Sequence, residues 1–560
     1  MMPRVDAPNP ALVTRRAVQR MPRLALLLFC AAYVLPGVFG RDPWRNADLS
    51  AFGYMLGIAE GRASWLAPSL GGLPADAALL SHWLGAVFVM ALGPWLGPAL
   101  AARVPFAMLL ALTLALTWYT TFHLARTQAA QPVAFAFGGE ADPVDYARAM
   151  ADAAVLALIA TLGLLQLGHE TTPELAQLCG VGLFMYSLAA APYRVARARL
   201  AVIAGLPLLA GSGAPAVALM VGLGGVLICA RSGYEQVRGF ALWVAAATLA
   251  SALLAWALGA WGWRITLGRE PLVALVLARQ WLWFMWPAWP LALWTLWRWR
   301  RHLLKRHISA PLVIVLSALA ANLAMGGSDR ALMLALPGLA VLAAFALPTL
   351  RRSAAAGIDW FSMTFFTVCA ITIWVIYAAM QTGVPARPAA NVARLAPGFV
   401  PTFALLPLLW ALAGTLAWLW LVRWRTGRHR VAVWKSLVLP AGGVALCWLL
   451  LMTLWLPLLD YARSPRPRVD RLARHVPRGS CIAAPGLGPT QVAALEYFGR
   501  YRVDARAGAA KGHCDWLLLE TRGAGASPPA PAATWTLVAR ERRPTDREEI
   551  TSVYRRAPAP

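Results

Sequence analysis

The chain alternates long apolar runs with short basic loops, and this pattern decides what it can fold into. The runs are roughly 17 to 25 residues long, the length that an α-helix needs to cross a hydrocarbon layer of about 30 Å, and there are about thirteen of them. The 560 residues are 59% hydrophobic and only 14% charged, whereas soluble proteins carry charge at ~25% of positions. The sequence therefore predicts an all-α polytopic membrane protein.

The formal net charge of +26 would suit a nucleic-acid-binding protein, but the arginines that produce it lie mainly in short loops between apolar runs. Such loops face the cytoplasm in membrane proteins. Arg15, Arg16, Arg20 and Arg23 precede the first apolar run, Leu24–Phe39, so we expect a cytoplasmic N-terminus. Alternation from there gives about thirteen spans and an outer C-terminus, with membrane lipids and no nucleic acid as partners.

One apolar stretch, Leu84–Leu96, is short and contains Gly93-Pro94. Because glycine and proline weaken the interior of a helix, we expect a surface or re-entrant helix here. This stretch is therefore left out of the count of spans.

Beyond Asp460 the composition changes, and proline, arginine and glycine become frequent. The patterns predict strands at Ser480–Ala484, Trp516–Glu520 and Trp535–Arg540 and a helix at Thr490–Arg500. We therefore expect a transmembrane domain, residues 1–459, and a small C-terminal α/β domain, residues 460–560. Long domains are exported largely regardless of charge, so the arginines of this domain are compatible with a periplasmic location.

Two of the seven cysteines, Cys481 and Cys514, lie in this polar tail, and the other five lie within apolar runs. If the tail faces an oxidising space, the two can form a disulfide. The alternative is a pair of free, buried thiols.

The first outer loop places an acid at a boundary between water and lipid. It reads Trp44-Arg45-Asn46-Ala47-Asp48, continues through the apolar stretch Leu49–Gly61 and ends in Trp65-Leu66-Ala67-Pro68-Ser69-Leu70-Gly71-Gly72. Asp48 lies outside the apolar spans on either side. This placement is typical of chemistry on a lipid-borne substrate.

This loop resembles that of the GT-C polytopic glycosyltransferases, in particular the aminoarabinose (lipid A) transferase-like and protein-mannosyltransferase-like group. Asp48 precedes Trp65 by seventeen residues, the register of the leading aspartate of that family, and Trp83-Leu84 and Ala102-Arg103-Val104-Pro105 look like further family stretches. The resemblance implies a GT-C fold in a bacterial inner membrane. It also implies inverting transfer of a sugar from a polyprenyl-phosphate donor to a periplasmic-face acceptor, which is lipid A, another glycolipid or a protein.

The resemblance assigns the role of catalytic base to Asp48, with a solvated loop carboxylate or a helix cap as the alternative. Glu170, in the second outer loop, is expected to orient the acceptor or to help Asp48 hold a divalent cation, Mg²⁺ or Mn²⁺, through oxygen ligands. Glu174 reads more simply as a first-turn acid of the next helix. Trp44 and Trp65 are candidates for stacking on a sugar.

Cations are needed to hold the leaving phosphate. Arg330 precedes a segment, Ala331–Ala340, that looks like a family stretch in which a basic residue comes first. It can bind phosphate through its planar fork, or it can be an interfacial arginine that reaches lipid headgroups. Arg264 and Arg269 are further candidates for substrate binding.

The chain departs from the family pattern at two places in the first loop. Ala77 stands where many members have a phosphate-binding lysine, followed by Ala78 and Leu79 in place of two prolines, and Leu49 stands where a second acid often follows the first. Because of these changes, the sequence does not identify the substrate. Two other functions also stay open: a transporter or flippase for lipid-linked sugars, and a non-catalytic partner in envelope assembly. Few charged residues lie within the spans, which favours an enzyme over a transporter.

Overall fold

The computed structural model describes residues 9–44, 46–262, 272–427, 432–522, 534–543 and 546–557. The chain forms two compact units, each assembled from three separate segments. Unit 1 comprises Met1–Gly37, Phe106–Ile371 and Leu409–Leu450, and unit 2 comprises Val38–Pro105, Thr372–Leu408 and Leu451–Pro560. The loop predicted as the first outer loop therefore belongs to the same unit as the C-terminal tail.

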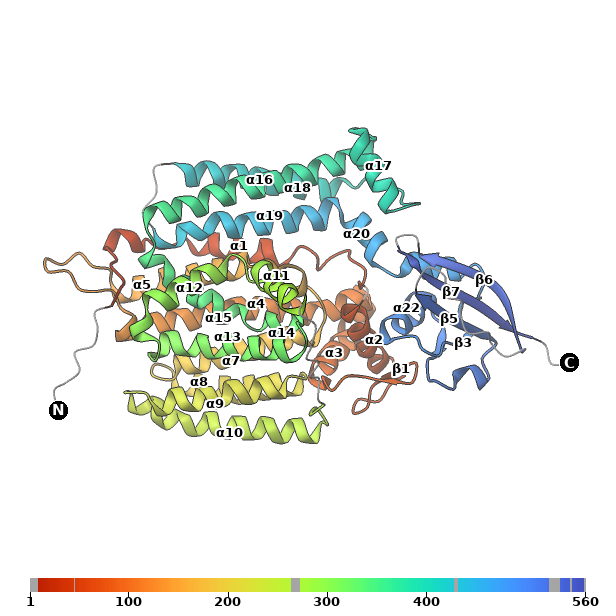
Figure 1. The fold of residues 1–560 in the computed structure, drawn as a ribbon, viewed down its shortest axis with the longest axis horizontal. Helices are drawn as coiled ribbons and strands as arrows, with labels where there is room; N and C mark the ends of the chain where they lie inside the picture. Colours follow the sequence, from red (N-terminus) through yellow and green to blue (C-terminus); the bar gives the residue numbers. More distant parts are fainter. Residues whose placement is uncertain are drawn as a thin grey trace. The chain divides into compact units, whose positions relative to one another are not determined.

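Unit 1 is helical (Figure 1). Its helices, some of which continue into unit 2, are α1 (Arg23–Val34), α4 (Pro98–Ala125), α5 (Pro143–Ala160), α6 (Leu162–Leu167), α7 (Pro173–Ala190), α8 (Val195–Gly211), α9 (Pro215–Ala230), α10 (Glu235–Ala257), α11 (Leu272–Phe284), α12 (Ala288–Arg298), α13 (Arg306–Ala324), α14 (Asp329–Met333), α15 (Leu336–Ala346), α16 (Arg352–Thr382), α18 (Leu405–Thr426) and α19 (Val438–Leu454). Every residue of α15 is buried. A helix that is apolar on all sides belongs in the interior, and α15 packs there against α5, α12 and α13.

Helices α7, α8, α9 and α10 pack in succession (Figure 1). Glycines let α7 and α8 approach closely, because a Cβ atom on Gly180 would lie 2.9 Å from the carbonyl oxygen of Gly205, and small residues at such contacts are typical of membrane helices. Leu200, Leu223 and Leu242 are more than half exposed on the outside of this row. Exposed leucines of this kind are suited to contact with lipid.

Two of the expected spans are broken. The run expected as one helix at Ala153–Leu167 divides at Thr161, whose backbone is extended. The run expected at Trp281–Trp297 divides into α11 and α12 around Pro287, since proline lacks the amide hydrogen that would continue the helix. The two breaks meet, because the amide of Leu162 donates to the carbonyl oxygen of Trp286 over 3.0 Å.

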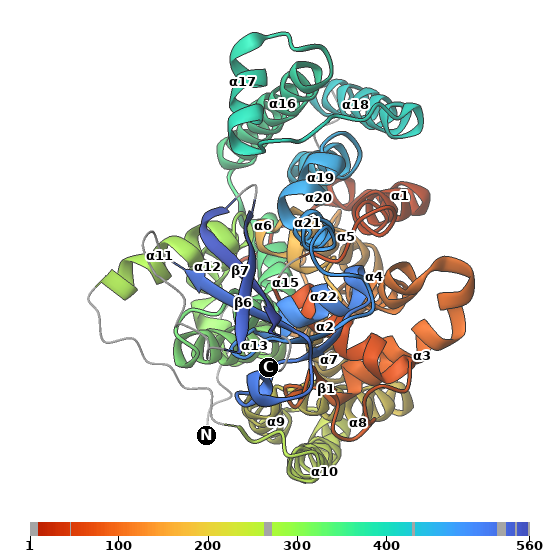
Figure 2. The ribbon, with the colours of Figure 1, turned by 90° about the vertical axis from the view of Figure 1, so that its right-hand side faces the viewer.

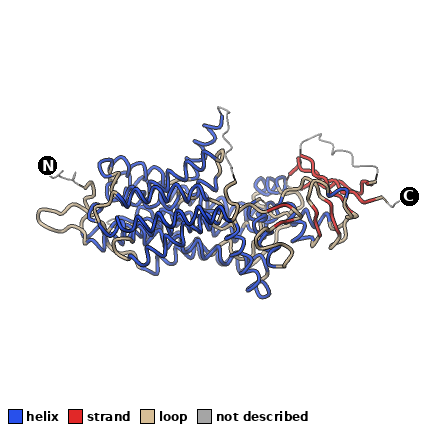
Figure 3. Tube along the Cα trace, turned by 90° about the horizontal axis from the view of Figure 1, so that it is seen from below, coloured by secondary structure: helices blue, strands red, loops and turns tan. Residues whose placement is uncertain are grey.

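Unit 2 combines helices with a mixed sheet, whose strands gather in one region (Figure 3). Its elements are α2 (Ala47–Ala59), β1 (Ser69–Leu70), β2 (Leu73–Pro74), α3 (Leu79–Leu96), α17 (Ala386–Leu395), α20 (Leu456–Arg463), α21 (Arg466–Leu472), β3 (Cys481–Ala483), α22 (Pro489–Gly499), β4 (Arg502–Asp504), β5 (Trp516–Arg522), β6 (Trp535–Arg543) and β7 (Asp546–Arg556). The strand order is β4-β3-β5-β7-β6. Strand β3 is parallel to β4 and β5, and β7 is antiparallel to β5 and β6.

Helix α22 joins the first-loop segment to the tail within unit 2. It packs on α2, as Figure 2 shows, and the helices are so close that a Cβ atom on Gly53 would lie 2.7 Å from that of Ala493. The expected strands and helix of the tail are present as β3, β5, β6 and α22. Strands β4 and β7 were not predicted, and the boundary at residue 460 stays a prediction.

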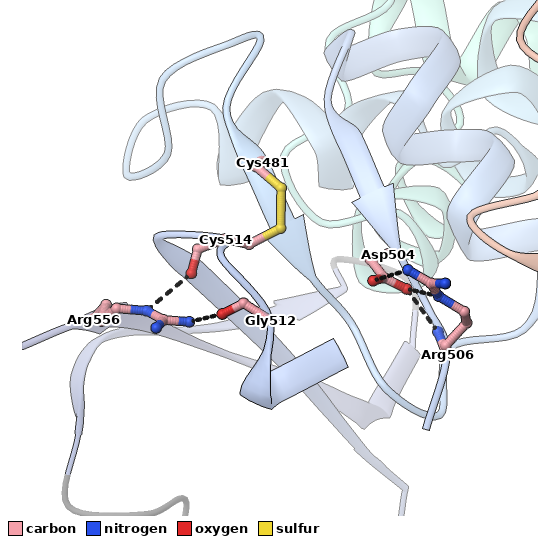
Figure 4. Close-up of a disulfide and its surroundings, with 6 residues drawn as sticks. All are labelled: Cys481, Asp504, Arg506, Gly512, Cys514 and Arg556. Atoms are coloured by element: carbon pink, nitrogen blue, oxygen red, sulfur yellow. Dashed lines mark hydrogen bonds and ion pairs between the residues drawn. A yellow bond between two sulfur atoms is a disulfide. The ribbon is translucent and has the colours of Figure 1, made fainter. Parts of the chain in front are cut away.

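The cysteine pair of the tail is bonded, so the disulfide alternative is confirmed (Figure 4). The bridge connects Cys481, in β3, to Cys514, which precedes β5 and lies in a small core with Leu517, Trp535 and Tyr554. Nearby, the guanidinium of Arg556 donates to the carbonyl oxygens of Cys514 and Gly512.

Seven of the helices that the structure describes are long and apolar enough to cross a membrane: Leu79–Leu96, Pro98–Ala125, Glu235–Ala257, Arg306–Ala324, Arg352–Thr382, Leu405–Thr426 and Val433–Leu454. The polytopic, mostly helical fold with a small C-terminal α/β part is therefore confirmed, and the count of thirteen spans stays a prediction. The helix expected at Leu84–Leu96 is longer than predicted, and its placement as a surface or re-entrant helix stays a prediction. Helix α3 starts at Leu79 and continues through Pro94 to Leu96.

Candidate functional site

Asp48 lies in the first turn of α2, where the amide dipoles favour a negative charge. The helix begins after Asn46, whose φ of 78° turns the chain into it. Asp48 is only 1% exposed, so it is not the solvated loop carboxylate that was the alternative. Its Oδ2 atom accepts from the backbone amide of Trp44 over 3.2 Å and lies 3.4 Å from Nη2 of Arg41. The side chain of Arg41 is fully buried, so Asp48 has a buried cation as its partner.

Trp44, a candidate for sugar stacking, is held by protein on several sides. Its Nε1 atom donates to Oδ1 of Asp460 over 2.7 Å. The guanidinium groups of Arg41 and Arg463 lie 4.6 Å and 4.9 Å from the centre of its ring. In this structure the indole therefore packs the residues around Asp48, and a sugar would have to displace a guanidinium to stack on it.

Trp65 is more accessible, with 40% of its surface exposed. Its carbonyl oxygen accepts from Nε1 of Trp83 over 2.7 Å, so the two tryptophans that carried part of the family resemblance are in contact. The open indole of Trp65 leaves a surface on which a sugar ring could stack. Ala77 lies just before α3 and brings no charge to this region.

A second carboxyl group lies close to Trp44. Asp460 accepts from the backbone amide of Asp42 over 3.3 Å as well as from Trp44. Burial raises its pKa to about 6, and the charge of Asp42 acts in the same direction, whereas the hydrogen bond from Trp44 opposes them. Asp42 itself is paired with Arg466, with the closest atoms 2.6 Å apart.

Sequence reasoning missed Arg41 and Asp460. Arg41 has one feature in the sequence that could have identified it. It is a basic residue just after the first apolar run, in a loop that is predicted to face outward, where the positive-inside rule expects few basic residues. Asp460 follows the last apolar run, and in the sequence it is notable only as the position after which the composition changes. Its proximity to Trp44, 416 residues away, is a property of the fold.

In unit 1, Arg330 contacts both acids of the loop that the sequence predicts as the second outer loop. Its Nη2 atom lies 2.5 Å from Oε2 of Glu170. Its Nη1 atom donates to Oγ1 of Thr172 over 2.9 Å and lies 3.3 Å from Oε2 of Glu174. Glu170, Glu174 and Arg330 were considered separately in the sequence analysis, and the fold brings their side chains into contact. Glu174 is therefore a partner of Arg330 as well as a first-turn acid of α7.

The turn between α6 and α7 holds Glu170 in place. Glu170 is 4% exposed, and its Oε1 atom accepts from Nε2 of Gln166 over 2.9 Å. The adjacent His169 has both ring nitrogens next to carbonyl oxygens, those of Leu165 and Tyr33. On the other side, Ser328 caps α14 by accepting from the amide of Ala331, which fixes the start of the helix that carries Arg330.

Within the described residues, no group of three or more histidine, cysteine or acidic side chains is placed to hold a metal ion. Asp48 belongs to unit 2 and Glu170 to unit 1, so a divalent cation shared by these two carboxylates stays a prediction. Arg264 and Arg269 lie outside the described residues.

Neither a scan against protein-family models nor a comparison with curated proteins gives a match for this sequence. The fold does match solved structures. ArnT from Cupriavidus metallidurans in the apo state aligns with a TM-score of 0.57 at 14% identity, and the same protein bound to undecaprenyl phosphate aligns with a TM-score of 0.58 at 15% identity. Both alignments cover 95% of this chain and 96% of the ArnT chain. The chain has an ArnT-like GT-C fold. Because the alignment extends over nearly the whole chain, the similarity includes the C-terminal sheet as well as the helices.

Proposed function

We propose that this protein transfers a sugar from a polyprenyl-phosphate carrier to an acceptor at the outer face of a bacterial inner membrane. The observation that carries the proposal is the buried pair of Asp48 and Arg41 at the first turn of α2. This acid lies at the sequence position that resembles the leading aspartate of GT-C enzymes, in a chain with an ArnT-like fold, and both facts support the proposal. The ArnT structure with undecaprenyl phosphate supports a donor of the same chemical class.

The donor phosphate is proposed to bind at Arg330. In the structure its guanidinium is shared by Glu170 at 2.5 Å and Glu174 at 3.3 Å. Glu174 has the longer contact and is the more exposed of the two acids, so it is the partner that a phosphate would replace. Glu170 would stay on Nη2 and keep the guanidinium oriented. Arg330 would then stabilise the phosphate as it leaves with the electron pair of the sugar–oxygen bond.

A cavity of about 740 Å³ in unit 1 suits the hydrocarbon part of this donor. Its walls are almost entirely apolar and include Trp283, Trp286, Trp294 and Phe361. Leu162, at the start of α6, also lines the cavity, and α6 contacts both α11 and α14. The same short helix therefore borders the apolar cavity and leads to Glu170, which supports a donor with its chain in the cavity and its phosphate at Arg330.

Asp48 is proposed to accept the proton of the acceptor hydroxyl while that oxygen attacks the sugar carbon. The new carbon–oxygen bond forms on the face opposite the departing phosphate, so the configuration at this carbon inverts. The proton moves to Asp48, and Arg41 stabilises the carboxylate before the reaction. A substrate reaching Oδ2 of Asp48 would have to compete with Arg41 and with the amide of Trp44.

A polar cavity of about 850 Å³ in unit 2 is a candidate site for the acceptor headgroup. It is bordered by Arg62, which is paired with Glu60 and Glu496. Arg500 and Arg502 also border it, and neither forms an ion pair with another of the described residues. This charge suits an acceptor that carries phosphate, such as lipid A.

The proposal places the C-terminal domain, residues 460–560, in the periplasm and the transmembrane domain, residues 1–459, in the inner membrane. If the reaction uses a divalent cation, Mg²⁺ or Mn²⁺, the carboxylates of Asp48 and Glu170 are its proposed ligands.

Mass spectrometry of the envelope lipids and glycoproteins of a deletion strain tests this function. Loss of a sugar from one lipid or protein class, restored by the wild-type gene, is the expected result. If a lipid-linked sugar accumulates before any acceptor has lost its sugar, the result would instead favour a flippase. An unchanged envelope, together with failure of the purified protein to bind undecaprenyl phosphate, would contradict the proposal.

A further inference from the structure

A second basic site lies at the other end of α13. A cavity of about 630 Å³ is lined there by the turn between α9 and α10, the segment after α4 and the residues around the start of α13. Its basic residues are Arg231, Lys305 and Arg306, and His302 and His307 lie beside them. None of the described residues that line the cavity is acidic, and the nearest acid in the sequence, Glu235, is exposed at the start of α10.

Arg306 is the unusual member of this group. All three nitrogens of its guanidinium are buried, and none has a hydrogen-bond partner in the described structure. The guanidinium lies 5.6 Å from the centre of the Tyr234 ring. A buried cation without an acceptor is unfavourable, and an aromatic ring compensates for only part of the lost hydration. The site is therefore electrostatically incomplete as the protein stands.

Further arginines strengthen the positive potential. The charges of Arg126, Arg194, Arg197 and Arg306 all act on the ring of His123. None of these four arginines forms an ion pair with a carboxylate within the described part of the chain. Such a concentration of unneutralised positive charge attracts anions.

This site is distinct from the proposed donor site. Arg306 begins α13, and Arg330 follows its end by a few residues. A helix of 19 residues is about 28 Å long at 1.5 Å per residue. One phosphate cannot reach both arginines, so a ligand at Arg306 is a different molecule from a donor whose phosphate is at Arg330.

We propose that the cavity at Arg306 binds the phosphate group of an anionic ligand. Two phosphate oxygens would accept from the fork of the Arg306 guanidinium, and Arg231, exposed where α9 ends, would contact the same group. A phosphate ester could come from the headgroup of an anionic lipid or from a soluble phosphate compound. Leu304 is 83% exposed and Tyr234 is 46% exposed at the edge of the cavity, which suits a ligand that also has an apolar part.

Binding to the purified full-length protein tests the proposal, with inorganic phosphate and phosphatidylglycerol as separate probes. Thermal unfolding in a non-ionic detergent is measured with and without phosphate. Native mass spectrometry counts the phosphatidylglycerol retained from nanodiscs, with phosphatidylcholine nanodiscs for comparison. Arg306→Gln removes the buried guanidinium. Arg301→Gln is the matched control, because Arg301 is an exposed arginine of the same loop that does not line the cavity.

Wild type and Arg301→Gln should bind at least one probe, and Arg306→Gln should bind it at least about tenfold more weakly. Stabilisation by inorganic phosphate would identify a soluble ligand, and retention of phosphatidylglycerol alone would identify a lipid headgroup. Equal binding by all three proteins, or no binding of either probe, would overturn the proposal. If Arg306→Gln does not fold, Arg231→Gln, with its exposed side chain, replaces it under the same criteria.

Discussion

The Nη2 atom of Arg330 lies 2.5 Å from Oε2 of Glu170, which links α14 to the turn between α6 and α7. Glu170 is almost fully buried, whereas 22% of the Arg330 side chain remains exposed. Removing one member of a buried ion pair leaves the other uncompensated. This contact therefore keeps an accessible guanidinium in a fixed orientation, which is what phosphate recognition needs.

Substitutions of Arg330 and of its partner Glu174 should have opposite effects on donor binding. Arg330→Ala removes a charge-assisted hydrogen bond and should weaken binding of undecaprenyl phosphate by about tenfold or more. Glu174→Gln removes the carboxylate that competes with the phosphate and should strengthen binding by a factor of roughly two to five. Native mass spectrometry of the purified variants measures both changes. Arg394→Ala, on the exposed helix α17, is the control and should bind like wild type; weaker binding by Glu174→Gln would argue against competition at Arg330.

Asp460 should make the stability of unit 2 depend on pH. Burial raises its pKa from 3.8 to about 6, so between these values the native state binds more protons than the unfolded state. Its contribution to the free energy of unfolding is then fully present below pH ~4 and is lost as the pH rises through ~6. Asp460→Asn mimics the protonated form, so its stability relative to wild type should be greater at pH 8 than at pH 4.5. Thermal unfolding at several pH values tests this, with exposed Asp470→Asn as the control; a difference that does not change with pH would contradict it.

The disulfide between Cys481 and Cys514 should contribute substantially to the stability of the C-terminal sheet. It closes a loop with a sequence separation of 33 residues, for which loop entropy gives a stabilisation of about 3 to 4 kcal/mol. The double variant Cys481→Ala, Cys514→Ala should lose protection from amide hydrogen exchange in β3 and β5. Cys369→Ala, which removes a free cysteine, is the control. Thiol labelling of both Cys481 and Cys514 in intact, unreduced protein would rule out the bridge.

The alternating arginine clusters predict which loops face the periplasm. A phosphatase reporter fused after Arg463 should be active, because this position precedes the exported tail. Fusions near Arg301 and Arg425 should be silent, because positive loops stay in the cytoplasm. Immunoblots of the fusions control for their expression. Phosphatase activity at Arg425 would contradict the thirteen-span topology.

The sequence predicts single elements and single charged residues well, because each depends on local pattern. The register from Asp48 to Trp65 indicated the acid of the first loop, and the ends of apolar runs indicated Glu170 and Arg330. Their pairing was not predictable, since 160 residues separate them and no local signal links an outer loop to one particular span. For the same reason, no local pattern indicated that α22 packs on α2.

Errors in the predicted helices have a similar cause. Hydropathy measures whether a segment is apolar, and it does not show where the backbone leaves the helix. Hydropathy therefore did not predict that the backbone is extended at Thr161 or that a new helix begins at Ala288. Conversely, Pro94 was given too much weight, because α3 continues through it to Leu96.

Turnover of Asp48→Asn tests the proposed mechanism most directly. Asparagine keeps the size of the side chain and can still accept from the amide of Trp44, but it cannot act as a base or stay ionised beside Arg41. With a polyprenyl-phosphate-linked sugar and the acceptor identified from the deletion strain, we expect turnover to fall by ~10²-fold or more while donor binding is largely kept. Asp515→Asn, an exposed substitution in the same unit, should leave turnover unchanged. Near-normal turnover by a folded Asp48→Asn protein would contradict the role of Asp48 as the catalytic base.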